Sequence, residues 1–282
     1  MISTSAKIRI ARALSAFVLF FRRLAGLTPD VVARRRGVTW KLNLAEGIDF
    51  AIYLLGGFEV RTLRRYETLI REGDVVLDIG ANVGAHTLPL AQLVGKTGRV
   101  YAFEPTRYAY SKQLVNIALN PQLAPRITAQ QMMLTSSNTA ELPPAVYSSW
   151  PLESAEDLHV DHHGRLMTTE GARPCTLDTF LAEKGVARVD LIKLDVDGNE
   201  AAVLQGAQAT LQKFKPRIMI ELAPYVHGED PGEFDQLIES ITSMGYELKD
   251  MATGRLLPKT PEALRQSIPE MGGLNVLAST ST

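Results

Sequence analysis

The stretch Val75-Val76-Leu77-Asp78-Ile79-Gly80-Ala81-Asn82-Val83-Gly84 decides the fold of this 282-residue chain. Its apolar first half predicts a buried strand over 75–79, and the residues that follow, 85–94, have the pattern of a helix. Gly80 and Gly84 lack a Cβ, so the backbone can turn sharply between strand and helix and approach a ligand closely. This order of elements predicts a nucleotide-type site at the carboxyl end of a parallel strand.

Two ligand classes compete for this loop. A dinucleotide favours a second glycine where Asn82 stands, because its pyrophosphate must approach the backbone. Asp78 adds a negative charge that we expect to face the ligand, which suits the sulfonium and ammonium of S-adenosylmethionine and repels a diphosphate. Glu104-Pro105 ends the next predicted strand, where an acid can accept both ribose hydroxyls of either ligand. The residues predicted to bind the cofactor are Asp78, Gly80, Asn82, Gly84, Glu104 and Pro105.

Apolar runs alternate with helical patterns from about residue 66 onward, which is typical of a parallel α/β sheet with helices on both faces. Further strands are predicted over 99–103, 126–130, 189–196 and 217–222, with an antiparallel pair over 246–249 and 273–279. Helices are predicted over 106–119, 176–184, 199–213 and 231–244. Residues 131–176 are polar and rich in proline, so we expect a lid or substrate insertion within a domain over 66–282.

The two strand-end motifs, Asp78–Gly84 and Ala102–Pro105, resemble the cofactor motifs of the FkbM-type methyltransferases. Thr176–Asp178, the run Asp190–Glu200 and the strand at 216–221 resemble later signatures of that family; Leu194 and Asp197 depart mildly from its usual Lys-Ile-Asp-Val-Glu-Gly. The resemblance covers about residues 60–225. It implies a seven-stranded class I methyltransferase fold, S-adenosylmethionine as cofactor, and methyl transfer to a hydroxyl of a sugar, glycan or secondary metabolite.

Three residues are candidates for the chemistry of the site. Asp195 ends the predicted central strand and is our first choice for a general base; His86, just past the glycine loop, is the alternative. Lys193 is the third candidate, and it is also placed to pair with a neighbouring acid. Asp195, Asp197 and Glu221 are candidate ligands for a divalent cation such as Mg²⁺, since they are oxygen donors at adjacent strand ends.

Other residues have simpler interpretations. Glu200 is expected to be an acid in the first turn of a helix. The run His159-Val160-Asp161-His162-His163 resembles a metal cluster, but a solvated or substrate-contacting pair is the commoner role of such histidines. Tyr108, Tyr147 and Trp150 can stack on an acceptor or simply pack. Cys175, the only cysteine, is expected to be a small buried side chain.

The N-terminal segment differs in charge from the rest of the chain. The formal charge is +8 over residues 1–65, and +7 over 1–36 alone, although the net charge of the whole chain is −1. Apolar residues from Ile10 to Leu24 recur at helical spacing, and the longest apolar run, 16–21, is too short to span a bilayer. We therefore expect a basic arm over 1–65 made of an amphipathic helix and short strands, with a β-like stretch over 38–44. We expect its helix to pack on the body, to contact a membrane surface, or to recruit an anionic or lipid-linked acceptor.

Composition limits the class of protein. A hydrophobic fraction of 45% and a charged fraction of 22% predict a soluble globular protein, and a single cysteine indicates a reducing compartment. The chain is expected in the cytoplasm, free or peripheral to the membrane, with a homodimer open as an alternative. A non-catalytic protein that retains the fold and a dinucleotide-dependent oxidoreductase stay as alternatives to a methyltransferase. No motif of a nucleic-acid methyltransferase follows the central strand.

Overall fold

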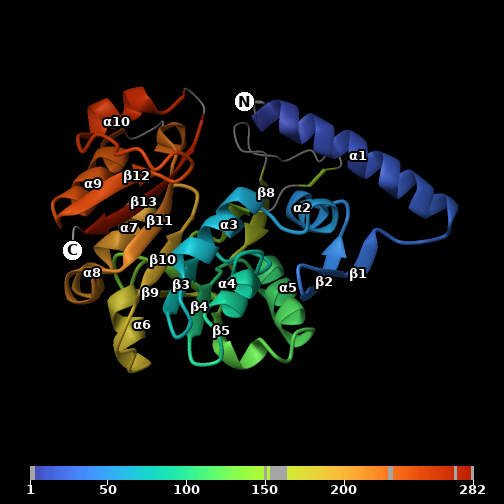
Figure 1. Cartoon of the computed structure of the whole chain (residues 1–282), viewed down its shortest axis with the longest axis horizontal. Coiled ribbons are helices and arrows are strands. Elements are labelled where there is room, and N and C mark those ends of the chain that lie inside the picture. The colour runs from blue at the N-terminus through green and yellow to red at the C-terminus, as the bar shows by residue number, and fades with distance from the viewer. Residues whose placement is uncertain (1–3, 149–150, 153–163, 228–230, 270–271, 281–282) are drawn as a thin grey trace.

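The computed structural model describes residues 4–148, 151–152, 164–227, 231–269 and 272–280 (Figure 1). The helices are α1 (Thr4–Leu24), α2 (Gly47–Leu55), α3 (Val60–Leu69), α4 (Thr87–Leu93), α5 (Arg107–Ala118), α6 (Leu177–Glu183), α7 (Glu200–Gln205), α8 (Gln208–Phe214), α9 (Pro231–Thr242) and α10 (Pro261–Ser267). The strands are β1 (Asp30–Arg35), β2 (Val38–Asn43), β3 (Val75–Ile79), β4 (Arg99–Phe103), β5 (Ile127–Gln130), β6 (Met132–Leu134), β7 (Ala145–Ser148), β8 (Arg165–Thr168), β9 (Arg173–Cys175), β10 (Leu191–Leu194), β11 (Arg217–Leu222), β12 (Tyr246–Asp250) and β13 (Leu274–Thr280).

A seven-stranded sheet with the order β12-β13-β11-β10-β3-β4-β5 forms the centre of the molecule. β3 pairs in parallel with β4 on one side and with β10 on the other. β13 is antiparallel to both of its neighbours, β11 and β12. The predicted α/β class, the parallel centre and the antiparallel closing pair are confirmed. The strand order changes direction at β3, so the carboxyl ends of β3, β4 and β10 meet where open α/β sheets bind ligands.

Two hydrophobic cores cover the two faces of the sheet. Side chains alternate along β3, with Val76 in the core beneath α2–α5 and Leu77 and Ile79 in the core beneath α6–α10. Asp78 and Lys193 alternate with those apolar residues, so both project toward the side of α3 and α4. Asp78 and Lys193 therefore lie together in the buried layer between the sheet and the helices α3 and α4.

One predicted helix is wrong: residues 199–213 form two short helices, α7 and α8, which meet at Gly206 and Ala207. A Cβ on Gly206 would lie 2.2 Å from the backbone oxygen of Thr135, so the chain passes too close to this neighbour for any larger residue. Asp178 then caps α8 by accepting hydrogen bonds from the Ala209 and Thr210 amides. The break is set by tertiary contacts that helical periodicity does not register.

The N-terminal arm is a helix, a β-hairpin and two further helices. β1 and β2 pair antiparallel, and Trp40 and Leu42 on β2 are buried against the body. The predicted amphipathic helix is confirmed as α1, which projects past the body in Figure 1. Within the described residues, no helix combines the length and the apolar character needed to cross a membrane.

The predicted insertion contains short strands of its own. β6 pairs with β9, and β7 pairs with β8. Met132, Leu134 and Cys175 at its two ends belong to the core under α6–α10, so Cys175 has the buried position expected of it. The part that leaves the core is therefore shorter than 131–176.

Candidate active site

The turn after β3 brings the ends of two neighbouring strands into direct contact. Gly80 has a φ of +79°, and a Cβ built on it would lie 1.7 Å from the backbone oxygen of Asp195, the residue after β10. The Asp195 amide donates a hydrogen bond to the Ile79 carbonyl at 3.2 Å. Gly84 also has a positive φ, +88°. Position 80 therefore requires glycine for the approach of β10 as well as for the turn.

Asn82 lies between the two glycines and takes a left-handed backbone conformation although it is not a glycine. Its φ is +48°, a left-handed conformation that asparagine tolerates because its side chain can bond locally. The side-chain oxygen of Asn82 accepts from the Val83 amide at 2.9 Å. Its Nδ2 donates to the hydroxyl of Ser148, at the end of β7, at 3.0 Å. The insertion therefore reaches the glycine loop through a contact between side chains 66 residues apart.

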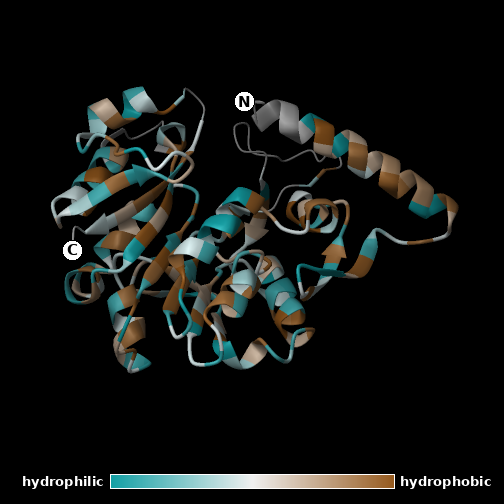
Figure 2. Ribbon diagram, viewed as in Figure 1, coloured by the Kyte–Doolittle hydropathy of each residue, from teal (hydrophilic) through white to brown (hydrophobic). Residues whose placement is uncertain are grey.

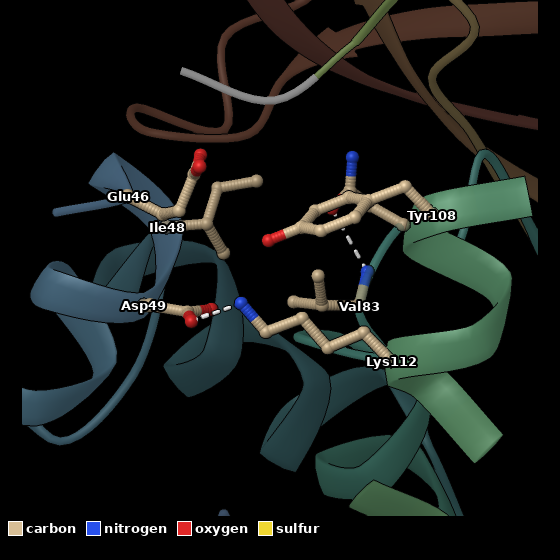
Figure 3. A pocket seen from close by; sticks show the side chains of 7 residues that line it. Glu46, Ile48, Asp49, Val83, Tyr108 and Lys112 are labelled. Carbon is tan, nitrogen blue, oxygen red and sulfur yellow. Dashed lines mark hydrogen bonds and ion pairs between the residues drawn. The ribbon is translucent and has the colours of Figure 1, made fainter. Parts of the chain in front are cut away.

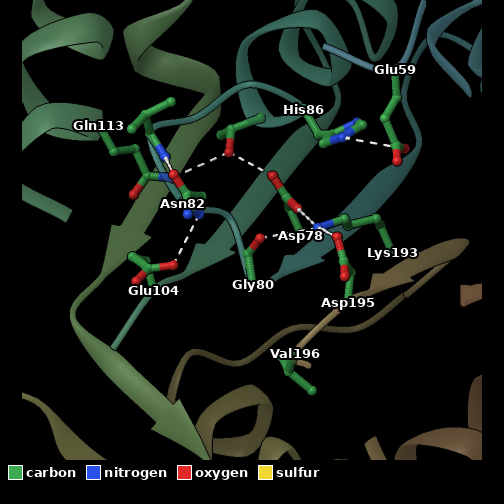
Figure 4. A network of polar contacts seen from close by, with 12 residues as sticks. Glu59, Asp78, Gly80, Asn82, His86, Glu104, Gln113, Lys193, Asp195 and Val196 are labelled. Atoms are coloured by element: carbon green, nitrogen blue, oxygen red, sulfur yellow. Dashed lines mark hydrogen bonds and ion pairs between the residues drawn. The ribbon is translucent and has the colours of Figure 1, made fainter. Parts of the chain in front are cut away.

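A buried ion network lies under the loop (Figure 4). Lys193 stands beside Asp78 in the parallel register of β10 and β3. The Lys193 Nζ lies 3.0 Å from the Gly80 carbonyl oxygen, 3.1 Å from Asp195 Oδ2 and 3.7 Å from Asp78 Oδ1. Asp78 also accepts a hydrogen bond from the Thr87 hydroxyl at 2.6 Å. The lysine thus ties both acids to the backbone of the loop.

Charge in this network decides what each group can do. Burial alone lowers the pKa of Lys193, but attraction to Asp195 and Asp78 outweighs it and raises that pKa above its ordinary value. Burial raises the pKa of Asp78, whose side chain is fully enclosed, so the carboxylate does not stand open to a ligand as we expected from the sequence. The ammonium of Lys193 outweighs burial at Asp195 and lowers its pKa. Lys193 accordingly pairs with its neighbouring acids, the simpler of its two predicted roles.

Glu104 follows β4 and holds the loop from the other side. Its Oε2 accepts from the Asn82 amide at 2.9 Å, and its Oε1 accepts from the Thr106 amide at 2.9 Å and the Thr106 hydroxyl at 2.5 Å. Burial raises the pKa of Glu104, and these hydrogen bonds oppose the rise. Pro105 separates the acid from Thr106, which precedes α5. The acid is therefore fixed in orientation at the strand end.

His86 is buried behind the loop. Its Nδ1 lies 3.0 Å from the Tyr66 hydroxyl on α3, and its ring packs edge-on against Phe58 and Tyr66. Glu59 Oε2 is 3.9 Å from Nε2. Burial, reinforced by the charge of Lys193, lowers the pKa of His86 from 6.5 to about 3. The histidine is therefore neutral at physiological pH, and it packs in the protein core.

Four carboxylates and a tyrosine line a pocket beyond the end of β10; its lining includes Asp195, Asp197, Glu200, Glu221 and Tyr225. Glu200 is committed to the backbone, accepting from the Val196 amide at 3.1 Å and the Gly198 amide at 3.0 Å. This confirms its interpretation as an acid at the start of a helix, α7. Asp195 pairs with Lys193, and Asp197 and Glu221 complete the acidic lining.

Two of these acids have strongly shifted pKa values. Burial and the charge of Asp195 raise the pKa of Glu221 to about 8. Asp197 reaches solvent at the rim of the pocket, but desolvation by the surrounding protein, followed by the charges of Asp195 and Glu200, raises its pKa to about 7. The crowding brings the proton affinity of both groups close to neutral pH, as is common at functional sites.

The metal candidates Asp195, Asp197 and Glu221 do share this pocket. In the part of the chain that the structure describes, however, no three His, Cys, Asp or Glu side chains are arranged as the ligands of a metal ion, so the Mg²⁺ prediction gains no support. His159, Asp161, His162, His163 and Trp150 lie outside the described residues. Tyr108 and Tyr147 are both more than a third exposed.

A second, smaller pocket lies between the arm and α5 (Figure 3). Its lining includes Glu46, Asp49, Asn82, Tyr108 and Lys112, and Lys112 forms an ion pair with Asp49. Sequence reasoning missed these arm residues, as it missed Ser148 beside Asn82. No local pattern identifies them, because each meets the loop only through the tertiary fold.

The residues around the loop fit S-adenosylmethionine. Gly80 leaves no Cβ in the turn. Glu104 is 3% exposed and accepts three hydrogen bonds from the protein, and its carboxylate has about four acceptor sites, so it keeps capacity for a ribose hydroxyl. Asp195, only partly buried, places negative charge beside the loop, which suits a sulfonium and an ammonium. The same negative charge would repel a diphosphate. The donor and acceptor set therefore matches a cationic nucleoside.

Comparison with known proteins identifies the family. The family model described as methyltransferase FkbM domain matches residues 78–248. The hexuronic acid methyltransferase AglP of Haloferax volcanii is 26% identical over 193 residues, covering 64% of this chain and 71% of that protein. The 31-O-demethyl-FK506 methyltransferase FkbM of Streptomyces tacrolimicus is 29% identical over 214 residues, covering 67% of this chain and 78% of that protein.

Two further matches differ in their extent. The AMB antimetabolite synthetase AmbE of Pseudomonas aeruginosa is 29% identical over 203 residues, which is 62% of this chain but 10% of that much longer protein. The crystal structure of an FkbM methyltransferase from Methylobacillus flagellatus KT aligns with 79% of this chain and 48% of its own, with 18% identity and a TM-score of 0.47.

The family match spans the glycine loop, Glu104 and the β10 end, which are the parts that form the site. It excludes the oxidoreductase alternative, because the matching domain is a methyltransferase. The chain belongs to the FkbM methyltransferase family, and it is an S-adenosylmethionine-dependent methyltransferase with the class I α/β fold.

Proposed function

We propose that this methyltransferase acts on a hydroxyl group of a sugar, a glycan or a secondary metabolite. The observation that supports it is the acid-lined pocket, which shares Asp195 with the glycine loop. Carboxylate oxygens accept hydrogen bonds from hydroxyl groups, and Tyr225 adds a ring against which an acceptor can pack. Two relatives support parts of this proposal: one is named for a hexuronic acid, which is a sugar derivative, and the other for an acceptor that lacks a methyl on an oxygen.

S-adenosylmethionine, when bound, supplies a methyl group activated by its positively charged sulfur. In the proposal, the backbone of the Gly80–Gly84 turn lies against the cofactor, and Glu104 accepts hydrogen bonds from its ribose. Asp78 and Lys193 act from beneath, because they fix the turn and the orientation of Asp195. Asn82 contributes by holding the β7 end over the loop.

Proton removal is assigned to Glu221. Asp195 was our first choice for the general base, but its pairing with Lys193 lowers its pKa and makes it a weaker proton acceptor. Glu221 has a pKa of about 8, closer to the operating pH. We therefore assign Asp195 to orienting the acceptor hydroxyl and Glu221 to accepting its proton.

The test is the pH dependence of methyl transfer to a panel of neutral sugars, hydroxylated metabolites and uronic acids. The rate should rise with pH through about 8, as Glu221 ionises, and Glu221→Gln should lose this rise together with most of the activity. Asp197→Asn should move the rise to lower pH, because it removes a charge that raises the pKa of Glu221.

Acceptor preference gives an independent outcome. Since the pocket is lined with acids, neutral acceptors should be methylated faster than uronic acids of similar size. Methyl transfer to nitrogen or carbon acceptors alone would contradict the proposal, and so would a pH profile that Glu221→Gln leaves unchanged.

A further inference from the structure

The outward face of α1 is apolar and has no partner among the residues that the structure describes. Its large side chains are between 43% and 69% exposed, and they are Ile10, Leu14, Phe17, Phe20, Phe21 and Leu24. The rings of Phe17 and Phe21 contact each other edge-on at 4.8 Å, and those of Phe20 and Phe21 at 5.4 Å. Figure 2 shows hydrophobic residues along much of the projecting helix. Contiguous apolar patches of this kind mark interaction surfaces.

The opposite face of α1 is fixed to the rest of the arm, so the helix cannot turn its apolar side inward. Ser15 donates a hydrogen bond to the Leu44 carbonyl at 2.8 Å, and Leu19 is buried beside it. Arg22 donates to the carbonyls of Thr28 at 2.9 Å and Asp30 at 3.0 Å. The exposed phenylalanines are therefore a property of the folded state.

Positive charge borders the apolar face. At 100° per residue, Arg9 and Arg23 lie on the same edge of the face, next to Phe20, and both are exposed. Residues 1–36 carry a formal charge of +7 in a chain whose total is −1. A basic edge on an exposed aromatic and aliphatic face is the pattern of a helix that lies in the interface of an anionic membrane.

Charge also argues against a second copy of the chain as the occupant. Pairing two α1 helices through their apolar faces would bring two segments of +7 together, and that repulsion has no compensation on the face itself. An anionic lipid surface offers both a complementary charge and an apolar layer. From Ile10 to Leu24 the helix is about 21 Å long at about 1.5 Å per residue, enough to lie flat across several lipids.

We propose that α1 docks this methyltransferase onto the surface of membranes that contain anionic lipids. In this arrangement the face from Ile10 to Leu24 lies among the lipid headgroups, and Arg9 and Arg23 meet lipid phosphates. The inference is independent of the acceptor, since it rests on the arm alone.

Co-sedimentation of the whole chain with vesicles tests this proposal. Vesicles of phosphatidylcholine with a quarter phosphatidylglycerol should bind the protein, and vesicles of phosphatidylcholine alone should bind it far less. Phe17→Ser with Phe21→Ser should reduce binding at least about tenfold, because it removes two of the largest apolar groups from the contact. Arg9→Gln with Arg23→Gln should weaken binding to the anionic vesicles and flatten its salt dependence.

Leu256→Ser is the matched control, because Leu256 is 53% exposed but lies far from α1 in sequence, after β12. Its vesicle binding should equal that of the unaltered chain. The S-adenosylhomocysteine affinity of each variant reports that the body is still folded. Light scattering in the absence of lipid shows whether two copies of the chain pair through α1 instead.

Three results would overturn the proposal. One is no sedimentation with anionic vesicles. The second is equal binding to both vesicle types, which would remove the role of charge. The third is a dimer in the absence of lipid that the phenylalanine substitutions convert to a monomer, without any effect of these substitutions on vesicle binding.

Discussion

Lys193 places an ammonium group inside the sheet, 4% exposed, between two acids that would otherwise repel each other. A buried ion pair contributes little net stability compared with apolar residues, but removal of one partner leaves an uncompensated charge. At this site the ion pairs also fix the loop, since the Lys193 Nζ donates a hydrogen bond to the backbone oxygen of Gly80. The lysine is thus a positioning residue for the loop.

Lys193→Met should lower the free energy of unfolding by about 3–5 kcal/mol, because Asp78 loses its buried counter-charge. Urea unfolding at neutral pH measures this loss. Adding Asp78→Asn should recover part of it, since the stranded charge is then absent. Lys249→Met, at an exposed position on β12, should change stability by no more than about 0.5 kcal/mol, and an equal loss in both variants would contradict the network.

His86 makes stability depend on pH in a defined direction. Because its pKa is about 3 in the folded chain and 6.5 when unperturbed, the unfolded state binds one more proton between these values. Stability from this group is therefore complete above about pH 6.5 and falls by about 1.4 kcal/mol per pH unit below it. His86→Gln keeps a partner for Tyr66 and should remove that slope between pH 6 and pH 4. Parallel curves for the two proteins would contradict the buried neutral histidine.

At the scale of elements, the site depends on how closely the ends of β3 and β10 approach. Gly80→Ala should destabilise the chain and abolish S-adenosylhomocysteine binding, because the new Cβ would fall 1.7 Å from the Asp195 oxygen. Gly245→Ala is the control: its φ of +84° is similarly strained, but its Cβ would meet nothing within 4 Å. It should cost only the backbone strain of about 1–2 kcal/mol and leave binding intact. Equal effects of the two substitutions would show that conformation alone, and not the approach of β10, demands glycine.

Element prediction from sequence succeeded where the pattern is local. The strand at 75–79 and the turn after it are predicted by an apolar run followed by glycines, and the structure has them at those residues. The split between α7 and α8 was missed, since it comes from the contact of Gly206 with Thr135. The hairpin partner β1 was also missed, because its residues alternate between exposed and half-buried without a clear apolar face.

At the scale of the whole molecule, residues distant in sequence form the site. Sequence motifs predicted that Asp78, Glu104 and Asp195 would lie at neighbouring strand ends, because parallel strands place their carboxyl ends at one edge. They also led us to expect Asp78 to face the ligand, and that expectation was wrong because Asp78 is buried. The burial of Asp78 and the raised pKa of Glu221 follow from neighbours such as Lys193 and Asp195, which only the assembled sheet brings together.

The arm and the body also divide the charge of the molecule. The first 65 residues carry +8, and the remainder carries −9. The acids of the body include those of the candidate acceptor pocket, whereas the basic residues of the arm include those on the outer helix. Docking and catalysis are therefore assigned to different parts of the chain, which can be altered separately.

The central claim is that the carboxyl ends of β3 and β4 hold S-adenosylmethionine, with Glu104 on its ribose. Isothermal titration with S-adenosylhomocysteine tests it most directly, with melting curves to confirm folding. The unaltered chain should bind one equivalent. Glu104→Ala should weaken binding by about 10-fold to 150-fold, the value of a charged hydrogen bond of about 1.5–3 kcal/mol, and Glu104→Gln should weaken it less. Glu239→Ala, at an exposed position on α9, should bind as the unaltered chain does. No binding by the unaltered chain, or undiminished binding by folded Glu104→Ala, would contradict the claim.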